Sequence, residues 1–168
     1  MGTRALGPVA VAAALLALVV GPAAAEPVSG GLFVPGRSLG AVELGMTRAE
    51  VRATWGDRHG VCRDCRRPTW YFNERPFRAQ GTGVVFANGR VTHAFTVWRP
   101  SGWRTPEGLE LGEPGGEIGA TYGELTRRQC AGYVALVRED ARASSAFYVY
   151  EDEVWGFGLV KPGGSPCL

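Results

Sequence analysis

The chain has 168 residues, and 18 basic against 16 acidic side chains give it a formal net charge of +2 at pH 7. A balance this close to neutral excludes a general nucleic-acid binder, which needs a large basic surplus to displace counterions from phosphates. The length allows one domain or two very small ones.

The first 25 residues have the pattern of a signal peptide. Arg4 supplies the positive start, residues 9–20 form an apolar run, and residues 23–25 are alanines of the kind that precede a cleavage site. The run is too short to span a bilayer as a stable helix. We therefore expect a secreted protein, extracellular or cell-wall associated, with no membrane span after cleavage.

A short helix is predicted over residues 48–55, after an N-terminal arm at 26–41 in which residues 32–34 could add an edge strand. Thr47 suits the N-cap, and Glu50 stands three residues later, where its carboxylate can reach back to the cap amide. The glycine that follows Trp55 is a typical helix stop.

Three strands are predicted after this helix, because the segments are rich in β-branched and aromatic residues. They lie at 69–73, 83–87 and 91–98. Asn88-Gly89 joins the last two and is a strong hairpin signal.

The second half of the chain repeats this order. Residues 109–123 match residues 42–56 at a constant offset of 67, with seven of fifteen positions identical, which indicates a duplicated unit. A second helix is expected to begin at Pro114, weakened by glycines and held by packing of Ile118 and Tyr122.

Strands are expected to follow this second helix at 133–137, 146–150 and 154–160, with an acidic turn at 151–153. The sequence therefore predicts an α+β fold of two tandem repeats, each a short helix followed by a three-stranded antiparallel meander, with the helices on one face of the sheets. The predicted boundaries are the arm at 26–41, a first unit at 42–99, a linker at 100–108, and a second unit with its tail at 109–168.

Residues 44–56, L-G-M-T-R-A-E-V-R-A-T-W-G, followed by a cysteine-containing loop and a meander, resemble the β-lactamase inhibitor protein superfamily. That superfamily also includes small outer-membrane-assembly lipoproteins, and its inhibitors carry two tandem copies of this unit in a secreted actinobacterial chain. The second copy departs from the pattern, with Glu113-Pro114 in place of Met-Thr. The resemblance implies a tandem fold and an interaction module with a concave sheet surface. No segment matches the enzyme-contacting loops of the inhibitors, so β-lactamase inhibition is not implied.

Four cysteines in an exported chain predict two disulfides, for which three connectivities are possible. We favour Cys62–Cys65, which closes a tight local loop. The second pair is then Cys130–Cys167, which ties the tail onto the second unit.

The C-R-D-C motif offers two further hypotheses, redox catalysis and metal binding. An exported thiol–disulfide oxidoreductase would use Cys62 and Cys65, but the motif follows a helix and precedes a strand, outside the strand–helix context of such enzymes. A zinc site would combine these cysteines with His59 and a distant His93, which the oxidising compartment and the neighbouring arginines disfavour. We predict no metal and no cofactor.

Basic residues gather around the same motif. They could dock on an anionic cell-wall polymer or an acidic protein patch, although a solvated loop is the plainer interpretation. The candidates are Arg58, Arg63, Arg66 and Arg67.

Aromatic residues fill the predicted strands. Neighbouring side chains in a strand point to opposite faces, so Trp70 and Phe72 oppose Tyr71. If one face packs on the helices, the other displays aromatic rings, which are typical of protein-binding hot spots. We predict that Tyr71, Trp98, Tyr148 and Tyr150 lie on the open face.

These patterns favour a secreted, non-catalytic protein-binding module whose partner is an unidentified protein or cell-wall component. The sequence contains no nucleophile elbow, phosphate loop or metalloprotease motif, so no catalytic residue is predicted. The alternatives are the oxidoreductase and a cell-wall-associated structural protein that uses the basic loop.

Overall fold

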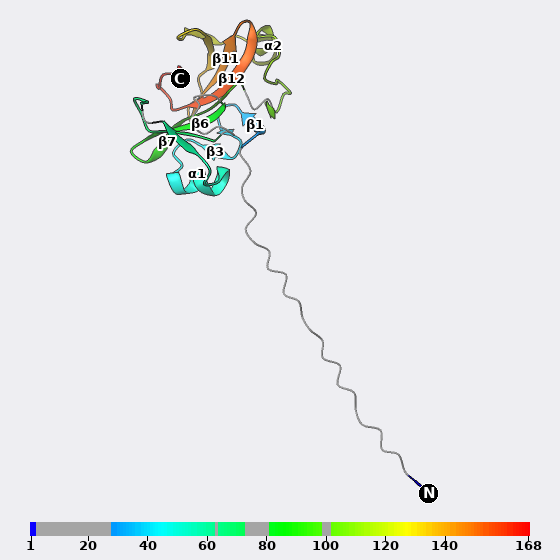
Figure 1. The fold of residues 1–168 in the computed structure, drawn as a ribbon. Helices are drawn as coiled ribbons and strands as arrows, with labels where there is room; N and C mark the ends of the chain where they lie inside the picture. Colours follow the sequence, from blue (N-terminus) through cyan, green and yellow to red (C-terminus); the bar gives the residue numbers. More distant parts are fainter. Residues whose placement is uncertain (3–27, 63, 73–80, 99–101) are drawn as a thin grey trace.

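The structure is a computed structural model that describes residues 1–2, 28–62, 64–72, 81–98 and 102–168. Almost all of the predicted signal peptide, and Arg63 of the basic loop, lie outside the described residues. Within these ranges the chain forms twelve β-strands and two short helices (Figure 1). The helices are α1 (Arg48–Trp55) and α2 (Gly116–Tyr122). The strands are β1 (Gly30–Val34), β2 (Ser38–Leu39), β3 (Val42–Glu43), β4 (Gly60–Cys62), β5 (Thr69–Tyr71), β6 (Gly81–Ala87), β7 (Arg90–Val97), β8 (Gly102–Arg104), β9 (Thr126–Gln129), β10 (Val134–Arg138), β11 (Ser144–Tyr150) and β12 (Glu153–Val160).

Eight of these strands form one large antiparallel sheet in the order β4-β5-β6-β7-β12-β11-β10-β9. The first half of the chain supplies β4 to β7 as one meander, and the second half supplies β9 to β12 as another. The two meanders join at the centre, where β7 pairs with β12 and Phe95 lies opposite Gly158. The remaining strands form a small sheet in the order β3-β2-β1-β8.

The predicted α+β class, with its two helix-plus-three-strand repeats, is wrong. The described chain is mostly β, each half supplies four strands to one continuous sheet, and four more strands form a sheet of their own. Most of the missed strands are only two or three residues long, too short to show an alternation of apolar and polar residues. The missed strand β9 reads T-R-R-Q, and all four of its side chains are exposed.

The small sheet is built from the N-terminal arm, from the first two residues of the predicted first unit and from the segment predicted as a linker. Strand β1 pairs antiparallel with β2 and parallel with β8. Phe33 of β1 and Trp103 of β8 are fully buried. The arm therefore adds no edge strand to the large sheet, and Trp103 of the predicted linker is part of the core.

The two helices differ in how they begin. Helix α1 has the predicted capping box, in which the Thr47 backbone N–H donates to the Glu50 carboxylate at 2.6 Å and the Thr47 hydroxyl accepts from the Glu50 N–H at 3.3 Å. Helix α2 begins at Gly116, two residues later than predicted, and has no side-chain cap. Packing holds it instead, because Ile118 is buried and Tyr122 half-buried against the core. No helix in the described part of the chain is long and apolar enough to cross a membrane.

The two matching segments make equivalent backbone contacts. Gly45 donates its N–H to the carbonyl of Val91 at 2.8 Å, and Gly112 donates to the carbonyl of Val154 at the same distance. Both glycines have a positive φ, of 84° and 92°, a backbone conformation that residues with a side chain rarely adopt. Each segment is thereby fixed to the first residues of a central strand, β7 or β12.

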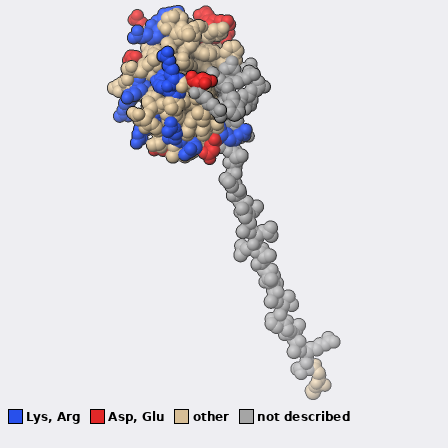
Figure 2. All heavy atoms as spheres, turned by 60° about the vertical axis from the view of Figure 1, so that its left-hand side comes forward, with Lys and Arg blue, Asp and Glu red and all other residues tan. Residues whose placement is uncertain are grey.

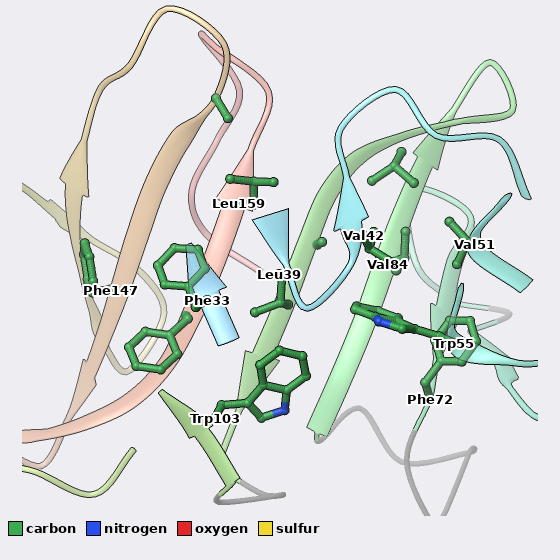
Figure 3. Packing of buried hydrophobic residues seen from close by; sticks show 14 of the residues in the cluster. Phe33, Leu39, Val42, Val51, Trp55, Phe72, Val84, Trp103, Phe147 and Leu159 are labelled. Atoms are coloured by element: carbon green, nitrogen blue, oxygen red, sulfur yellow. The ribbon is translucent and has the colours of Figure 1, made fainter. Parts of the chain in front are cut away.

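The large sheet has two distinct faces. We call the side that contacts the helices and the small sheet the inner face, and the opposite side the outer face. On the inner face, Phe33 stacks on Phe157 at a centroid distance of 5.1 Å and meets the edge of Phe147 at 5.6 Å. Figure 3 shows Phe33, Leu39 and Trp103 of the small sheet lying between the two halves of the large one. The inner face is thus a closed core.

Candidate functional site

The outer face carries a second cluster of buried side chains. It includes Tyr71 on β5, Phe95 on β7 and Tyr148 on β11, together with smaller residues of β6 and β10 to β12. Trp70 and Phe147 precede Tyr71 and Tyr148 in their strands and belong to the inner cluster. Adjacent side chains of these strands therefore point to opposite faces of the sheet. The predicted exposure of Tyr71 and Tyr148 is wrong, because both side chains are buried.

Glycines explain how Phe95 and Tyr148 are buried on a face that neither helix of the described residues covers. A Cβ atom at Gly83 of β6 would overlap the ring of Phe95, and one at Gly158 of β12 would overlap the hydroxyl group of Tyr148. The two rings therefore lie over the backbone of neighbouring strands, where a side chain larger than hydrogen has no room. The outer face is consequently flat over these strands, because the rings lie along the sheet.

A hollow of about 700 Å³ lies above this flat area. Its floor contains Tyr71, Val85, His93 and Phe95, which are all buried residues of β5 to β7. The loop after β4 and the C-terminal tail line the rest of the hollow. The residues from these two segments are Cys65, Arg66, Arg67, Ser165, Cys167 and Leu168.

Both segments that line the hollow are cross-linked. Cys62 is bonded to Cys65, and Cys130 is bonded to Cys167, as the sequence predicted. The first bond closes the loop that carries the two arginines, and the second holds the tail against β9 and β10. The hollow therefore keeps its shape without a ligand.

A chain of hydrogen bonds also ties the tail to the floor. Tyr148 donates its hydroxyl hydrogen to the carbonyl of Pro166 at 2.9 Å, and the same hydroxyl lies 3.0 Å from Nε2 of His93. Because that one hydrogen is used, His93 must donate through Nε2 and hold its lone pair on Nδ1. Burial, and to a smaller extent the charge of Arg67, lower the pKa of His93 to about 3, so the imidazole is neutral.

The residues of the zinc hypothesis are not brought together. His59 stacks on Trp70 on the inner face at a centroid distance of 4.0 Å, whereas His93 lies on the outer face. The described residues contain no group of three or more His, Cys, Asp or Glu side chains that could hold a metal ion. Cys62 ends strand β4 and does not begin a helix, so the helix N-terminus that carries the reactive cysteine of thiol–disulfide enzymes is missing at this position.

The described arginines of the basic loop are exposed. Arg58 lies between α1 and β4, and Arg66 and Arg67 lie beside the hollow. Figure 2 shows basic side chains in several separate groups, with no continuous basic surface on the visible face. Two other arginines near the motif instead cover inner-face rings, with Arg48 5.1 Å from the ring centre of Phe86 and Arg52 5.9 Å from that of Trp70.

Trp98 and Tyr150 are the predicted aromatic residues that the structure leaves exposed, at 52% and 36%. Their rings lie 6.4 Å apart between centroids, and Trp155 lies 6.0 Å from Tyr150. Trp98 follows β7 with a φ of 63°, and its N–H donates to the carbonyl of Trp155 at 2.7 Å. These residues border a second hollow of about 260 Å³ that also includes Glu151 and Glu153.

Sequence reasoning missed the hollow on the outer face. It treated His93 only as a distant metal ligand and gave the C-terminal tail no role beyond its disulfide. The glycines of β6 and β12 were a usable signal, since glycine inside a strand marks a close approach of another group.

No protein-family model matches the chain, and no curated protein matches it in sequence. Two solved structures are similar. An extracellular protein containing a SCP domain from Bacillus anthracis has a TM-score of 0.50 and 12% identity, over 70% of this chain and 44% of that one. The DUF4309 family protein YjgB from Bacillus subtilis has a TM-score of 0.48 and 15% identity, over 68% of this chain and 78% of that one.

This chain thus spans less than half of the length of the Bacillus anthracis protein. At 12% identity, that likeness is one of fold alone. Neither structure bears on the resemblance to the β-lactamase inhibitor superfamily, which stays a prediction.

Proposed function

We propose that this chain is an exported, non-catalytic binding protein that docks a protein partner through Trp98 and Tyr150. The observation that carries the proposal is the backbone of Trp98. A non-glycine residue in the left-handed region costs about 1–2 kcal/mol, and here it holds an indole ring half in solvent. Strain of this kind is typical of functional positions.

The composition of this surface also supports a protein partner. Tyr and Trp are enriched among residues that dominate binding energy, and they lie here beside a small hollow. The Trp98 ring rests against Tyr150, which in turn rests against the half-buried Trp155. A partner would therefore meet rings that are already ordered, which lowers the entropy lost on binding.

Export is supported by the two disulfides, which form and persist in oxidising compartments. The likeness in fold to a protein described as extracellular agrees with it.

The proposal is tested by capture from culture supernatant and cell-wall extract with the immobilised chain. The Trp98→Ala/Tyr150→Ala variant is expected to weaken capture by at least about thirtyfold, the effect of removing one strong hot spot. The matched control is Leu32→Ala/Val61→Ala, which removes two other exposed apolar side chains. Equal capture by all three proteins, or equal loss in both variants, would contradict the proposal.

The reduction potential of Cys62–Cys65 distinguishes the proposed binding protein from the oxidoreductase alternative. Thiol–disulfide enzymes have potentials of roughly −120 to −270 mV, whereas structural disulfides lie below about −300 mV. We expect the lower range, because neither cysteine begins a helix.

A further inference from the structure

We propose that the hollow on the outer face binds an amphiphilic anion, a small molecule with an apolar body and a carboxylate head. This site lies apart from the Trp98–Tyr150 surface and does not depend on the function proposed for it. The occupant follows from three properties of the hollow, namely its shape, its floor and its charge.

The shape favours a small molecule. The volume of about 700 Å³ lies within the range of typical ligand sites, roughly 300–1,000 Å³. Both lining segments are held by disulfides, so binding needs little ordering of the protein.

The floor favours an apolar body. Val85 and Phe95 line the floor with apolar side chains that are almost fully buried, and the ring of Tyr71 lies beside them. His93 is neutral and already bonded to Tyr148, so it places no charge against the ligand. An acyl chain or an aryl ring on this floor would be removed from water at no electrostatic cost.

The charge favours an anionic head. Arg66 and Arg67 are exposed beside the hollow, and no Asp or Glu is among its described lining residues. A guanidinium group binds a carboxylate through two parallel hydrogen bonds, so one arginine suffices to hold the head.

Tyr71 gives the head a second partner. Burial raises the pKa of its hydroxyl, which therefore stays protonated and can donate a hydrogen bond. Tyr71 and the two arginines therefore supply the donors that a carboxylate requires.

The test is calorimetric titration of the full chain with dodecanoate. Dodecanol and dodecyltrimethylammonium serve as ligands with the same apolar body but a neutral or a positive head. We expect dodecanoate to bind at least about tenfold more tightly than either. Equal affinity for the three ligands, or no binding of dodecanoate, would overturn the proposal.

Two variants locate the site. Arg66→Gln/Arg67→Gln is expected to weaken dodecanoate binding at least about tenfold, whereas Arg127→Gln/Arg128→Gln, an exposed pair on β9, is the control and should leave it within about twofold. Val85→Phe fills the floor and should also weaken binding at an unchanged net charge. Equal effects of the two arginine pairs would show a general attraction to positive charge and would reject the site. If Val85→Phe stays folded by circular dichroism and binds as the parent does, the ligand does not occupy the hollow.

Discussion

The inner and outer faces of the large sheet are built from the same strands but are closed in different ways. Two helices and the small sheet cover the inner face, where large side chains such as Phe33 and Phe157 interlock. The outer face is covered by its own rings, which lie over glycines, and by two cross-linked segments. The inner face is therefore a closed core, whereas the outer face keeps a hollow, and Trp98 and Tyr150 stay exposed.

A pair of phenylalanines gives the largest expected difference between the faces. Phe157→Ala opens a cavity in the closed inner core and should cost about 4 kcal/mol of unfolding free energy. Phe95→Ala enlarges a hollow that already exists, so water and the Tyr71 ring can fill the space, and the cost should be about 2 kcal/mol. Urea unfolding measures both values. Equal costs would mean that the outer face is as tightly closed as the inner one.

The two disulfides of the outer face should differ in the same measurement. Chain-entropy estimates give about 4 kcal/mol for a crosslink that closes a loop as long as that of Cys130–Cys167, and about 2 kcal/mol for one as short as that of Cys62–Cys65. We therefore expect the Cys130→Ser/Cys167→Ser variant to lose more unfolding free energy than the Cys62→Ser/Cys65→Ser variant. Removing the tail disulfide should also abolish dodecanoate binding, since the tail lines the hollow. Retained binding would show that the hydrogen bonds to Tyr148 and Tyr133 are enough to hold the tail.

The local signals of the sequence were reliable where a residue has one dominant physical role. Thr47 and Glu50 predicted the capping box, and Asn88-Gly89 predicted a turn in which both residues have positive φ. The cysteine pairing followed from the positions of the four cysteines. These features depend on a few neighbouring residues, so the rest of the fold does not alter them.

The fold class and half of the site depended on long-range contacts. Nothing local in residues 102–104 shows that they pair with β1, because a three-residue strand has no period to read. Tyr71 and Tyr148 both lie on the outer face, yet neither is exposed. The burial of Tyr148 depends on Gly158, one strand away, and on a tail that reaches back to its hydroxyl. Exposure is therefore a property of the packed sheet and not of the strand sequence.

Acid should weaken the outer face through His93. Its folded-state pKa of about 3 lies below the ordinary value of 6.5, so on acidification below 6.5 the unfolded chain binds a proton that the folded chain does not. Stability that is present above pH 6.5 is lost toward pH 3, by at most about 1.4 kcal/mol per pH unit. His93→Gln should be less stable at pH 7 but lose less between pH 6.5 and 5.5, before most carboxylates titrate. Parallel curves for the two proteins would place the titrating group elsewhere.

Substitution of Trp98 should have the smallest effect on the unfolding free energy. It tests whether the exposed indole ring serves binding or stabilises the fold. Trp98 has a φ of 63°, which glycine adopts freely, so Trp98→Gly should relieve the strained backbone. Against this gain stand the lost contact with Tyr150 and the greater freedom of glycine in the unfolded chain, so we expect a net stabilisation of about 0.5 kcal/mol. Trp98→Ala removes the same ring but keeps the strain, and should be neutral or slightly destabilising. If glycine stabilises the protein while partner capture is lost, the indole ring is held there for binding at the expense of stability. If glycine instead destabilises it by more than about 1 kcal/mol, Trp98 is a structural residue that closes the end of the outer face.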